Sequence, residues 1–532
     1  MKKRYILVLS AGLGIGVLLR FLNLLYFHTL EIDEAIYAQV IFAMTKGYIP
    51  YKDVVFVHPP VYLYIEYFVM LVNPNLLALR SFNVLLGIAT ICLIFYIGTL
   101  AFSKKTAFIA SGIYALYPLA IYSNKIALVD NGLTFFTTLM MLLFVKYLKG
   151  KKVKYLVLSG MFAGISFMTK YSALLVIGAL VLFSMFTFFR GKIIDLLIYI
   201  ISTLIFPLAM FFLLLLTNIW PFFFVQTIQW QIIRFGMFAD EKLWFFIQIV
   251  LSLFLLIVPV LFTTTCNIRD KNWQLIMAWF FVPLATFPFS KVVFLQYGFS
   301  LVPPLSILVA RGVDRHIPND FSFTRSMRKI LQLRLIMKKI VPLTTITLVI
   351  ISIFVIFLFS TPFAHNIRWV LFEGVIGSKS SAMLMQNQMN LGDYVKNLTT
   401  PNDKIWTSDA SIAFFAERII VEPNSEYWKL QGFFQDVWGY GWTKDDYRGP
   451  IKGYPTGLIS IHDIQSAWEE EKPKVIVIIR TSLVDYFIWH GIDNPYHFEQ
   501  GLANYIESHY HLENTFDMQN IEVWVRDQSA PD

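Results

Sequence analysis

Ionisable side chains that could do chemistry are concentrated in one short stretch near the start of the chain. Residues 31–60 read EIDEAIYAQVIFAMTKGYIPYKDVVFVHPP and lie between two hydrophobic segments. The stretch holds four acidic residues and one histidine: Glu31, Asp33, Glu34, Asp53 and His58. Carboxylates close to a lipid bilayer are costly unless they have partners or a function. A positioned carboxylate can act as a general base that takes a proton from an attacking group.

Three acidic residues are the candidates for catalysis. Asp33 and Glu34 open a segment of helical spacing, where they could serve only as an N-cap and as a complement to the helix dipole. That explanation suffices for one such pair taken alone. A third acidic residue, Asp130, stands in SNKIALVDNG directly before another hydrophobic segment. Because basic groups accompany both places, the sequence favours catalytic roles for Asp33, Glu34 and Asp130.

Four basic residues at the ends of hydrophobic segments are the candidates for binding a phosphate group: His58, Arg80, Lys170 and Lys291. A single Lys or Arg in such a place commonly extends toward lipid headgroups. Several that converge with carboxylates indicate a site where cations hold an anionic phosphate while a carboxylate removes a proton.

The elements that must position these residues are helices that cross a membrane. The chain of 532 residues is 57% hydrophobic and 15% charged, with a mean hydropathy of +0.60, which is typical of a protein with many membrane spans. Residues 5–27 are a long hydrophobic run without a cleavage site of small residues, so we expect an uncleaved first span. Further spans are expected at 76–102, 106–122, 131–148, 154–169, 171–189, 193–217, 242–264, 273–289, 293–310 and 340–361. The total is about eleven spans.

Two short helices are expected between the first and second spans. Apolar residues recur at helical spacing from Ile36 to Met44, and Gly47 marks the end, which predicts an amphipathic helix. A second helix follows Pro59-Pro60 and is too short to cross a bilayer comfortably. Both helices are therefore expected at the membrane interface.

The distribution of Lys and Arg predicts the orientation of the chain. Together with the N-terminus, the loops expected to face the cytoplasm hold far more basic residues than the opposite loops. Accordingly the acidic loop, Asp130, Lys170, Lys291 and everything after Thr361 are expected outside the cytoplasmic membrane. The net charge of +9 comes from short basic clusters between apolar runs, so no nucleic-acid partner is indicated.

The C-terminal part has the composition of a soluble domain, with 23 of the 35 acidic residues lying between Glu373 and Asp532. We therefore divide the chain into a membrane domain at 1–361 and a soluble extracytoplasmic domain at 362–532. Strands are expected at 404–407, 475–479 and 521–525, with helices at 461–471 and 501–509. The fold class is thus an α-helical polytopic membrane protein with a C-terminal soluble α/β domain. We expect this domain to influence acceptor choice rather than chemistry.

Several other chemistries are disfavoured. The sequence contains no GxxxxGK[ST] phosphate loop, no HExxH pair, no GxSxG elbow and no CxxC pair. The nine histidines are scattered, and His509 and His511 alternate in a way that is more typical of a surface than of metal ligands. We therefore expect no zinc site, and the sequence indicates no cofactor.

The order of these motifs resembles that of the C-type membrane glycosyltransferases, close to the protein O-mannosyltransferase and aminoarabinose (lipid A) transferase families. The first loop matches through Asp33-Glu34 with Tyr37, and through His58-Pro59-Pro60 with Tyr62. Later matches are Arg80, Asp130, the GISFMTK segment that ends at Lys170, and Ser290-Lys291 followed by Tyr297 and Pro303-Pro304. The resemblance covers most of the membrane portion.

This resemblance implies an activity and a set of roles. The donor is expected to be a sugar linked to a polyprenyl phosphate, and the transfer to invert the anomeric centre at the outer face with the first-loop Asp33 as base. Tyr37, Tyr62 and Tyr297 are the expected substrate-binding residues. His58 stands where aminoarabinose transferases usually have Lys, and Trp438 to Trp442 reads WGYGW in place of the Trp-Trp-Asp of oligosaccharyltransferases. The first departure disfavours a role in lipid A modification, and the second disfavours transfer of a whole oligosaccharide. The expected reaction is therefore transfer of a single sugar to an acceptor that the sequence does not name.

A different class of protein is the alternative. A transporter or flippase for a lipid-linked saccharide would also need cationic groups at the outer face. A translocation path should carry buried charge in the middle of its spans, whereas the ionisable residues here cluster at the outer ends. The absence of an internal repeat also favours the transferase.

Overall fold

The computed structural model describes eleven stretches of the chain: residues 3–28, 32–188, 193–233, 239–257, 270–291, 293–316, 374–407, 409–421, 461–479, 500–516 and 521–527. The expected span at 340–361 and the expected domain boundary at 361/362 lie outside these residues, as does Glu31.

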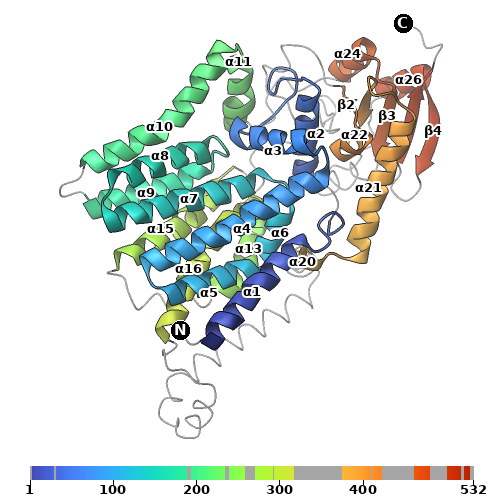
Figure 1. Ribbon diagram of the computed structural model, residues 1–532. Helices are drawn as coiled ribbons and strands as arrows, with labels where there is room; N and C mark the ends of the chain where they lie inside the picture. The colour runs from blue at the N-terminus through green and yellow to red at the C-terminus, as the bar shows by residue number, and fades with distance from the viewer. Residues whose placement is uncertain are drawn as a thin grey trace. The chain divides into compact units, whose positions relative to one another are not determined.

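Helices make up most of the described membrane portion (Figure 1). They are α1 (Lys3–Phe21), α4 (Leu76–Ala101), α5 (Lys104–Leu116), α6 (Pro118–Lys125), α7 (Val129–Gly150), α8 (Val153–Phe167), α9 (Ala173–Phe188), α10 (Ile193–Leu216), α13 (Ala239–Ser252), α15 (Lys271–Thr286) and α16 (Val302–His316). Shorter elements are α2 (Ile32–Thr45), α3 (Pro60–Val72), α11 (Trp220–Phe223), the π-helix η1 (Phe224–Gln229), α12 (Trp230–Ile233), the 3₁₀ helices η3 (Phe287–Phe289) and η4 (Leu295–Leu301), and α20 (Gly374–Ile376).

Among the described residues, three helices are long and apolar enough to cross a membrane, namely α4, α7 and α10. The α5 and α6 helices together qualify as a fourth span, bent by 60° at their junction. Pro118 begins α6, where it removes a backbone donor and interrupts the helix. The predicted multi-pass architecture is confirmed at this level, and the total of eleven spans stays a prediction.

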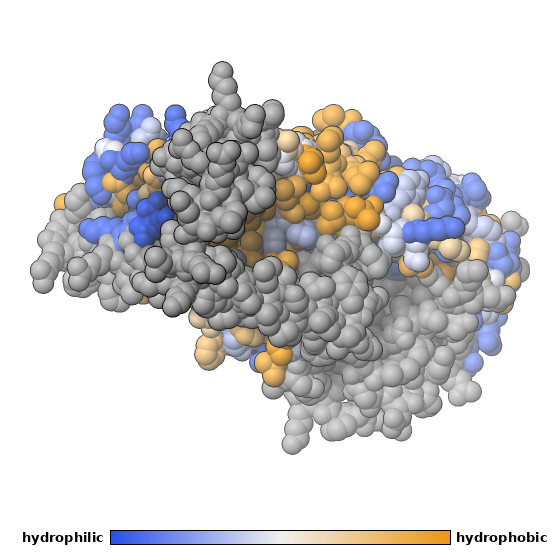
Figure 2. Space-filling view, turned by 90° about the horizontal axis from the view of Figure 1, so that it is seen from below, coloured by the Kyte–Doolittle hydropathy of each residue, from blue (hydrophilic) through white to orange (hydrophobic). Residues whose placement is uncertain are grey.

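The surface of α10 has the character expected of a lipid-facing helix. Only 11% of its most apolar window is buried. Ile201, Phe212 and Leu216 are 62%, 58% and 83% exposed. Figure 2 shows a broad area of exposed hydrophobic side chains flanked by hydrophilic ones. Apolar surface of this extent is costly in water and favourable in a bilayer.

The same helix packs against α8 through small residues. A Cβ atom added at Gly164 would lie 2.4 Å from the carbonyl oxygen of Thr203, and one at Gly160 would lie 2.6 Å from Ser202 Cβ. Because glycines four residues apart lie on the same helix face, they allow the two backbones to approach closely.

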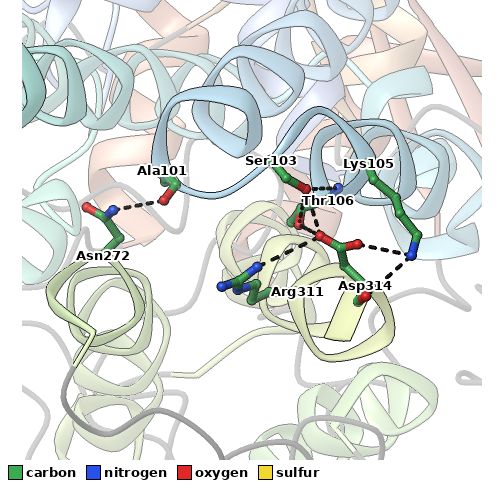
Figure 3. Close-up of polar contacts among 7 residues, drawn as sticks. All are labelled: Ala101, Ser103, Lys105, Thr106, Asn272, Arg311 and Asp314. Carbon is green, nitrogen blue, oxygen red and sulfur yellow. Dashed lines mark hydrogen bonds and ion pairs between the residues drawn. The ribbon is translucent and has the colours of Figure 1, made fainter. Parts of the chain in front are cut away.

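A polar cluster joins α5 to the end of α16 (Figure 3). Asp314 accepts hydrogen bonds from Ser103 Oγ and Thr106 Oγ1, both at 2.7 Å. Its carboxylate also lies 3.2 Å from Lys105 Nζ and 3.8 Å from Arg311 Nη1. Ser103 is at the same time the N-cap of α5 and accepts from the Thr106 amide. One carboxylate therefore fixes the start of one helix against the end of another.

The C-terminal part contains a five-stranded sheet with the strand order β2-β1-β3-β5-β4. Its strands are β1 (Lys404–Thr407), β2 (Ile419–Ile420), β3 (Val475–Ile479), β4 (Tyr510–Phe516) and β5 (Ile521–Arg526). Strand β1 pairs in parallel with β2 and β3, whereas β5 pairs antiparallel with β3 and β4. The helices of this part are α21 (Lys379–Asn397), α22 (Ala410–Ala416), α24 (Ile461–Glu471) and α26 (Gln500–His509). The strands predicted at 404–407, 475–479 and 521–525 are thus confirmed.

The described chain divides into two compact units that do not follow its linear order. The first unit holds residues 1–27, 80–209 and 236–378, and the second holds 28–79, 210–235 and 379–532. The second unit therefore combines the acidic loop, an aromatic segment and the C-terminal part. The distribution of basic residues predicts the same side of the membrane for these segments, and this stays a prediction.

Candidate active site

The first unit places an acidic and a basic candidate residue against each other. Asp130 lies in the first turn of α7, and Lys170 lies between α8 and α9. Lys170 Nζ is 2.8 Å from Asp130 Oδ1 and 2.7 Å from Asp130 Oδ2. The two side chains are only 9% and 6% exposed. Lys170 Nζ also lies 5.0 Å from the centre of the Tyr297 ring, so three of the predicted site residues come together.

Hydrogen-bonded turns fix both partners of this pair. The Thr134 hydroxyl donates to the carbonyl oxygen of Asp130 at 2.8 Å. The Lys170 amide donates to the carbonyl oxygen of Ser166 at 3.0 Å. A buried ion pair of this kind adds little net stability, because the cost of desolvation offsets most of the attraction. Net stability therefore does not account for this pair.

A buried amide network holds the chain on the N-terminal side of Asp130. Asn131 Nδ2 donates to Asn83 Oδ1 at 3.0 Å and to the carbonyl oxygen of Ser123 at 2.8 Å. Asn124 Nδ2 donates to Asn131 Oδ1 at 3.2 Å. The sequence analysis quoted this stretch for Asp130 and missed its asparagines, although polar side chains next to an apolar span were the available signal.

Arg80 has a different environment from that of Lys170. The side chain is fully buried, and Nη1 donates to the carbonyl oxygens of Leu24 and Leu25 at 3.1 and 2.9 Å. The guanidinium carbon lies 5.0 Å from the centre of the Phe27 ring. The described contacts of Arg80 are thus with the chain that leaves α1.

A second buried cation, which the sequence analysis missed, lies on the other side of this contact. Lys125 Nζ is 4.3 Å from the centre of the Phe27 ring. It donates to the carbonyl oxygens of Leu22 and Val375 at 2.7 and 2.9 Å. Gly377 packs here too, with a φ of +81° that an L side chain rarely adopts. Lys125 therefore ties the end of α1 to the segment that leads into α21.

In the second unit, Asp33 and Glu34 lie in the first turn of α2. Both carboxylates therefore stand where a negative charge complements the helix dipole. Asp33 is half-buried, whereas Glu34 is fully buried. Of the two carboxylates, Asp33 is therefore the more accessible to solvent.

Aromatic side chains surround His58 in the same unit. The Tyr37 and Phe56 rings lie 5.7 and 5.9 Å from the His58 ring, both edge-on. Tyr37 and Tyr62 are 4% and 1% exposed. Tyr37 thus lies beside the predicted phosphate-binding histidine, and both tyrosines are largely enclosed by protein.

A glutamine from a distant segment holds the loop that leads to His58. Gln226, on the π-helix η1, donates from Nε2 to the carbonyl oxygen of Tyr51 at 2.7 Å and accepts from the Phe56 amide at 3.2 Å. The Tyr51 hydroxyl in turn donates to the carbonyl oxygen of His58 at 2.8 Å. Gln226 is fully buried, and π-helical turns are frequent at functional sites. The sequence analysis missed this residue because nothing local links it to the loop.

Lys291 lies between η3 and η4, and its side chain is exposed. Within the described residues, no group of three or more His, Cys, Asp or Glu side chains could hold a metal ion.

A segment in the first half of the chain matches a known protein family. Residues 57–215 match the family described as dolichyl-phosphate-mannose-protein mannosyltransferase. This segment contains five of the candidate residues: His58, Tyr62, Arg80, Asp130 and Lys170. A comparison with curated protein sequences finds no match.

Solved structures extend the likeness over the whole chain. The crystal structure of ArnT from Cupriavidus metallidurans bound to undecaprenyl phosphate matches with a TM-score of 0.64 and 12% identity, over 100% of both chains. Its apo state matches with a TM-score of 0.62 and 14% identity, over 99% of both. The apo oligosaccharyltransferase of Archaeoglobus fulgidus gives 0.50 and 12% identity, over 99% of this chain and 75% of that one. These similarities show a shared fold.

Proposed function

We propose that this chain transfers a single sugar from a polyprenyl phosphate to an acceptor outside the cytoplasmic membrane. It has the fold of the C-type membrane glycosyltransferases, as the order of its motifs predicted. The family matched by residues 57–215 is described by its mannose donor linked to dolichyl phosphate, and one structure of the same fold holds undecaprenyl phosphate. Both support a lipid-linked sugar as the donor.

The observation that carries the proposal is the buried pair of Lys170 and Asp130 beside Tyr297. A phosphate that departs with negative charge needs fixed cations, and these are most effective where water is excluded. We assign Lys170 to this role, with Lys291 and His58 as further phosphate-binding groups. Arg80 contributes positive charge while it also binds backbone carbonyl oxygens. In this proposal, Tyr37, Tyr62 and Tyr297 line the substrate-binding site.

The proposed reaction is a single displacement with inversion. The acceptor atom attacks the anomeric carbon, and the bond from that carbon to the phosphate oxygen breaks, with its electron pair leaving on the phosphate. The acceptor proton passes to the general base. Asp33 is the best base, because Asp130 is already paired with Lys170 and Glu34 is fully buried. Asp130 and Glu34 would then orient their neighbours.

Most buried charges of the described helices disfavour the alternative of a saccharide transporter, because they lie near helix ends: Arg20 in α1, Arg80 in α4, Lys125 in α6 and Asp130 in α7. Glu66 is buried in the middle of α3, but that helix has only 13 residues and is too short to cross a bilayer comfortably. A translocation path should instead carry buried charge in the middle of its spans.

The test uses the full chain in nanodiscs with defined polyprenyl-phosphate sugars and candidate protein, lipid and glycan acceptors. Mass spectrometry should find free polyprenyl phosphate together with an acceptor that is heavier by one sugar. Movement of the intact donor across the membrane of liposomes, without any sugar transfer or hydrolysis, would show that the protein is a transporter and would overturn the proposal.

A further inference from the structure

The helix that carries Asp33 and Glu34 is buried on nearly all sides and does not lie on a surface with one face exposed. From Glu34 to Met44, every residue of α2 is buried except Ile36, which is intermediate. The prediction of a helix with one exposed face is therefore wrong for these residues. The packing partners of α2 include α3 and α22 of the C-terminal part, and Figure 1 shows α2 and α22 side by side.

A hydrogen bond joins the two helices at a defined point. Gln39 Nε2 donates to the carbonyl oxygen of Arg418, directly after α22, at 2.8 Å. The Gln39 side chain is 3% exposed, and its Oε1 is buried without a hydrogen-bond partner in the described part of the chain. An unsatisfied buried oxygen is costly, so packing alone would favour an apolar side chain here. The bond to Arg418 accounts for a glutamine at this position.

The carbonyl group that Gln39 reaches is held rigidly by the C-terminal part. Arg418 is 4% exposed and donates from Nε to Thr399 Oγ1 at 2.9 Å and from Nη2 to the carbonyl oxygen of Thr399 at 2.8 Å. Its Nη1 reaches the carbonyl oxygens of Ala416 and Glu417 at 3.1 and 3.0 Å. One guanidinium thus joins the chain after α21 to the end of α22, because its donors form a fixed planar fork.

We propose that the C-terminal domain is a positioning element for the reaction, and that Gln39 and Arg418 are the positioning residues through which it sets α2. The inference rests on the proposed role of Asp33. A general base must be held within hydrogen-bond reach of its proton, and a short helix gains such order from tertiary packing. The role differs from acceptor selection, because loss of the contact should slow the chemical step for every acceptor.

The first experiment removes the donor of the hydrogen bond in the full chain. Gln39→Met keeps the length and flexibility of the side chain, and Gln386→Leu changes an exposed glutamine of α21 as the matched control. We expect Gln39→Met to lower the single-turnover rate at saturating donor roughly tenfold, as one lost positioning hydrogen bond allows, with donor KM unchanged. Gln386→Leu should leave both values unchanged.

A second variant asks whether both residues act through one contact. Arg418→Lys loses the planar fork, so it should slow turnover in the same direction as Gln39→Met. The double variant should be no slower than the slower single variant, because the same coupling cannot be lost twice. Additive effects together with an unchanged acceptor profile would contradict the proposal, as would a normal rate in Gln39→Met.

Hydrogen exchange gives a readout that does not depend on the chemistry. In Gln39→Met, the amides of α2 should exchange about tenfold faster than in the parent chain, whereas those of α21 should not change. If the parent chain transfers no sugar, this measurement still tests the coupling while the proposed function fails. Unchanged protection of α2 would overturn the inference even in an active enzyme.

Discussion

Two candidate carboxylates, Asp130 and Asp33, occupy different environments. Asp130, in the first unit, is 6% exposed and holds Lys170 with both oxygens. Asp33, in the second unit, is half-buried in the first turn of a short helix. A carboxylate committed to a buried cation is a poor proton acceptor, since accepting the proton would leave that cation unpaired. On this ground we propose charge binding for the first region and proton transfer for the second.

The largest expected effect on stability and on donor binding comes from removing one partner of the ion pair in the first region. Lys170→Met leaves Asp130 buried without its partner, which should lower stability by about 3–5 kcal/mol and weaken donor binding roughly tenfold to a hundredfold. The double variant Asp130→Leu with Lys170→Met should recover the stability but not the donor affinity. Thermal unfolding and donor titration distinguish the two effects. Recovery of donor affinity together with stability would mean that the pair is only structural.

A smaller effect on donor binding is expected from the loss of Gln226, which holds the loop before His58 in the second region. Gln226→Met removes both hydrogen bonds to the loop that leads to His58, and donor KM should rise roughly threefold to tenfold. Gln248→Met is the control, because it changes a buried glutamine whose Nε2 has no hydrogen-bond partner in the described chain. Equal effects of the two substitutions on donor KM would show that Gln226 does not position the loop for donor binding.

The smallest effect concerns the contact between α5 and α16, away from both carboxylates. Burial alone would raise the pKa of Asp314, but hydrogen bonds from Ser103, Thr106 and Lys105 outweigh it and lower the pKa. A lowered folded-state pKa stabilises the protein above the unfolded value of about 3.9, and this contribution is lost as the pH falls through the folded value.

Asp314→Asn should therefore cost about 1 kcal/mol at pH 7, and the difference from the parent chain should vanish in acid. Thermal unfolding in nanodiscs as a function of pH gives the measurement. Glu417→Gln, in the exposed ion pair with Lys396, serves as a control with little expected effect. A difference that persists unchanged in acid would show that the Asp314 carboxylate charge is not what stabilises this contact.

Hydrophobic runs predicted several helices closely, because burial in lipid requires continuous apolar sequence. The span predicted at 76–102 is α4, and that at 193–217 is α10. The span predicted at 106–122 is instead broken into α5 and α6. Pro118 indicates a break in the helix at this point, but the apolar run continues on both sides of it and therefore predicted one continuous span.

Other features could not be predicted because they depend on contacts between distant parts of the chain. The residues of α2 follow a helical period that indicates one buried face, and the second face is covered by α22, whose sequence lies far along the chain. The bonds from Arg80 to the carbonyl oxygens of Leu24 and Leu25 depend likewise on tertiary packing. Sequence spacing predicts which residues share one face of a helix, but it does not predict which other element packs against that face.

The central claim is that Asp33 moves the proton while Lys170 holds the donor. The most direct test measures donor affinity and single-turnover rate side by side in Asp33→Asn and in the parent chain. We predict a loss of roughly 10² to 10⁴ in rate at saturating donor with unchanged donor affinity, since the amide keeps the size of the side chain and removes its basicity. A near-normal rate in Asp33→Asn, with Asp130→Asn or Glu34→Gln inactive and still binding donor, would contradict the account.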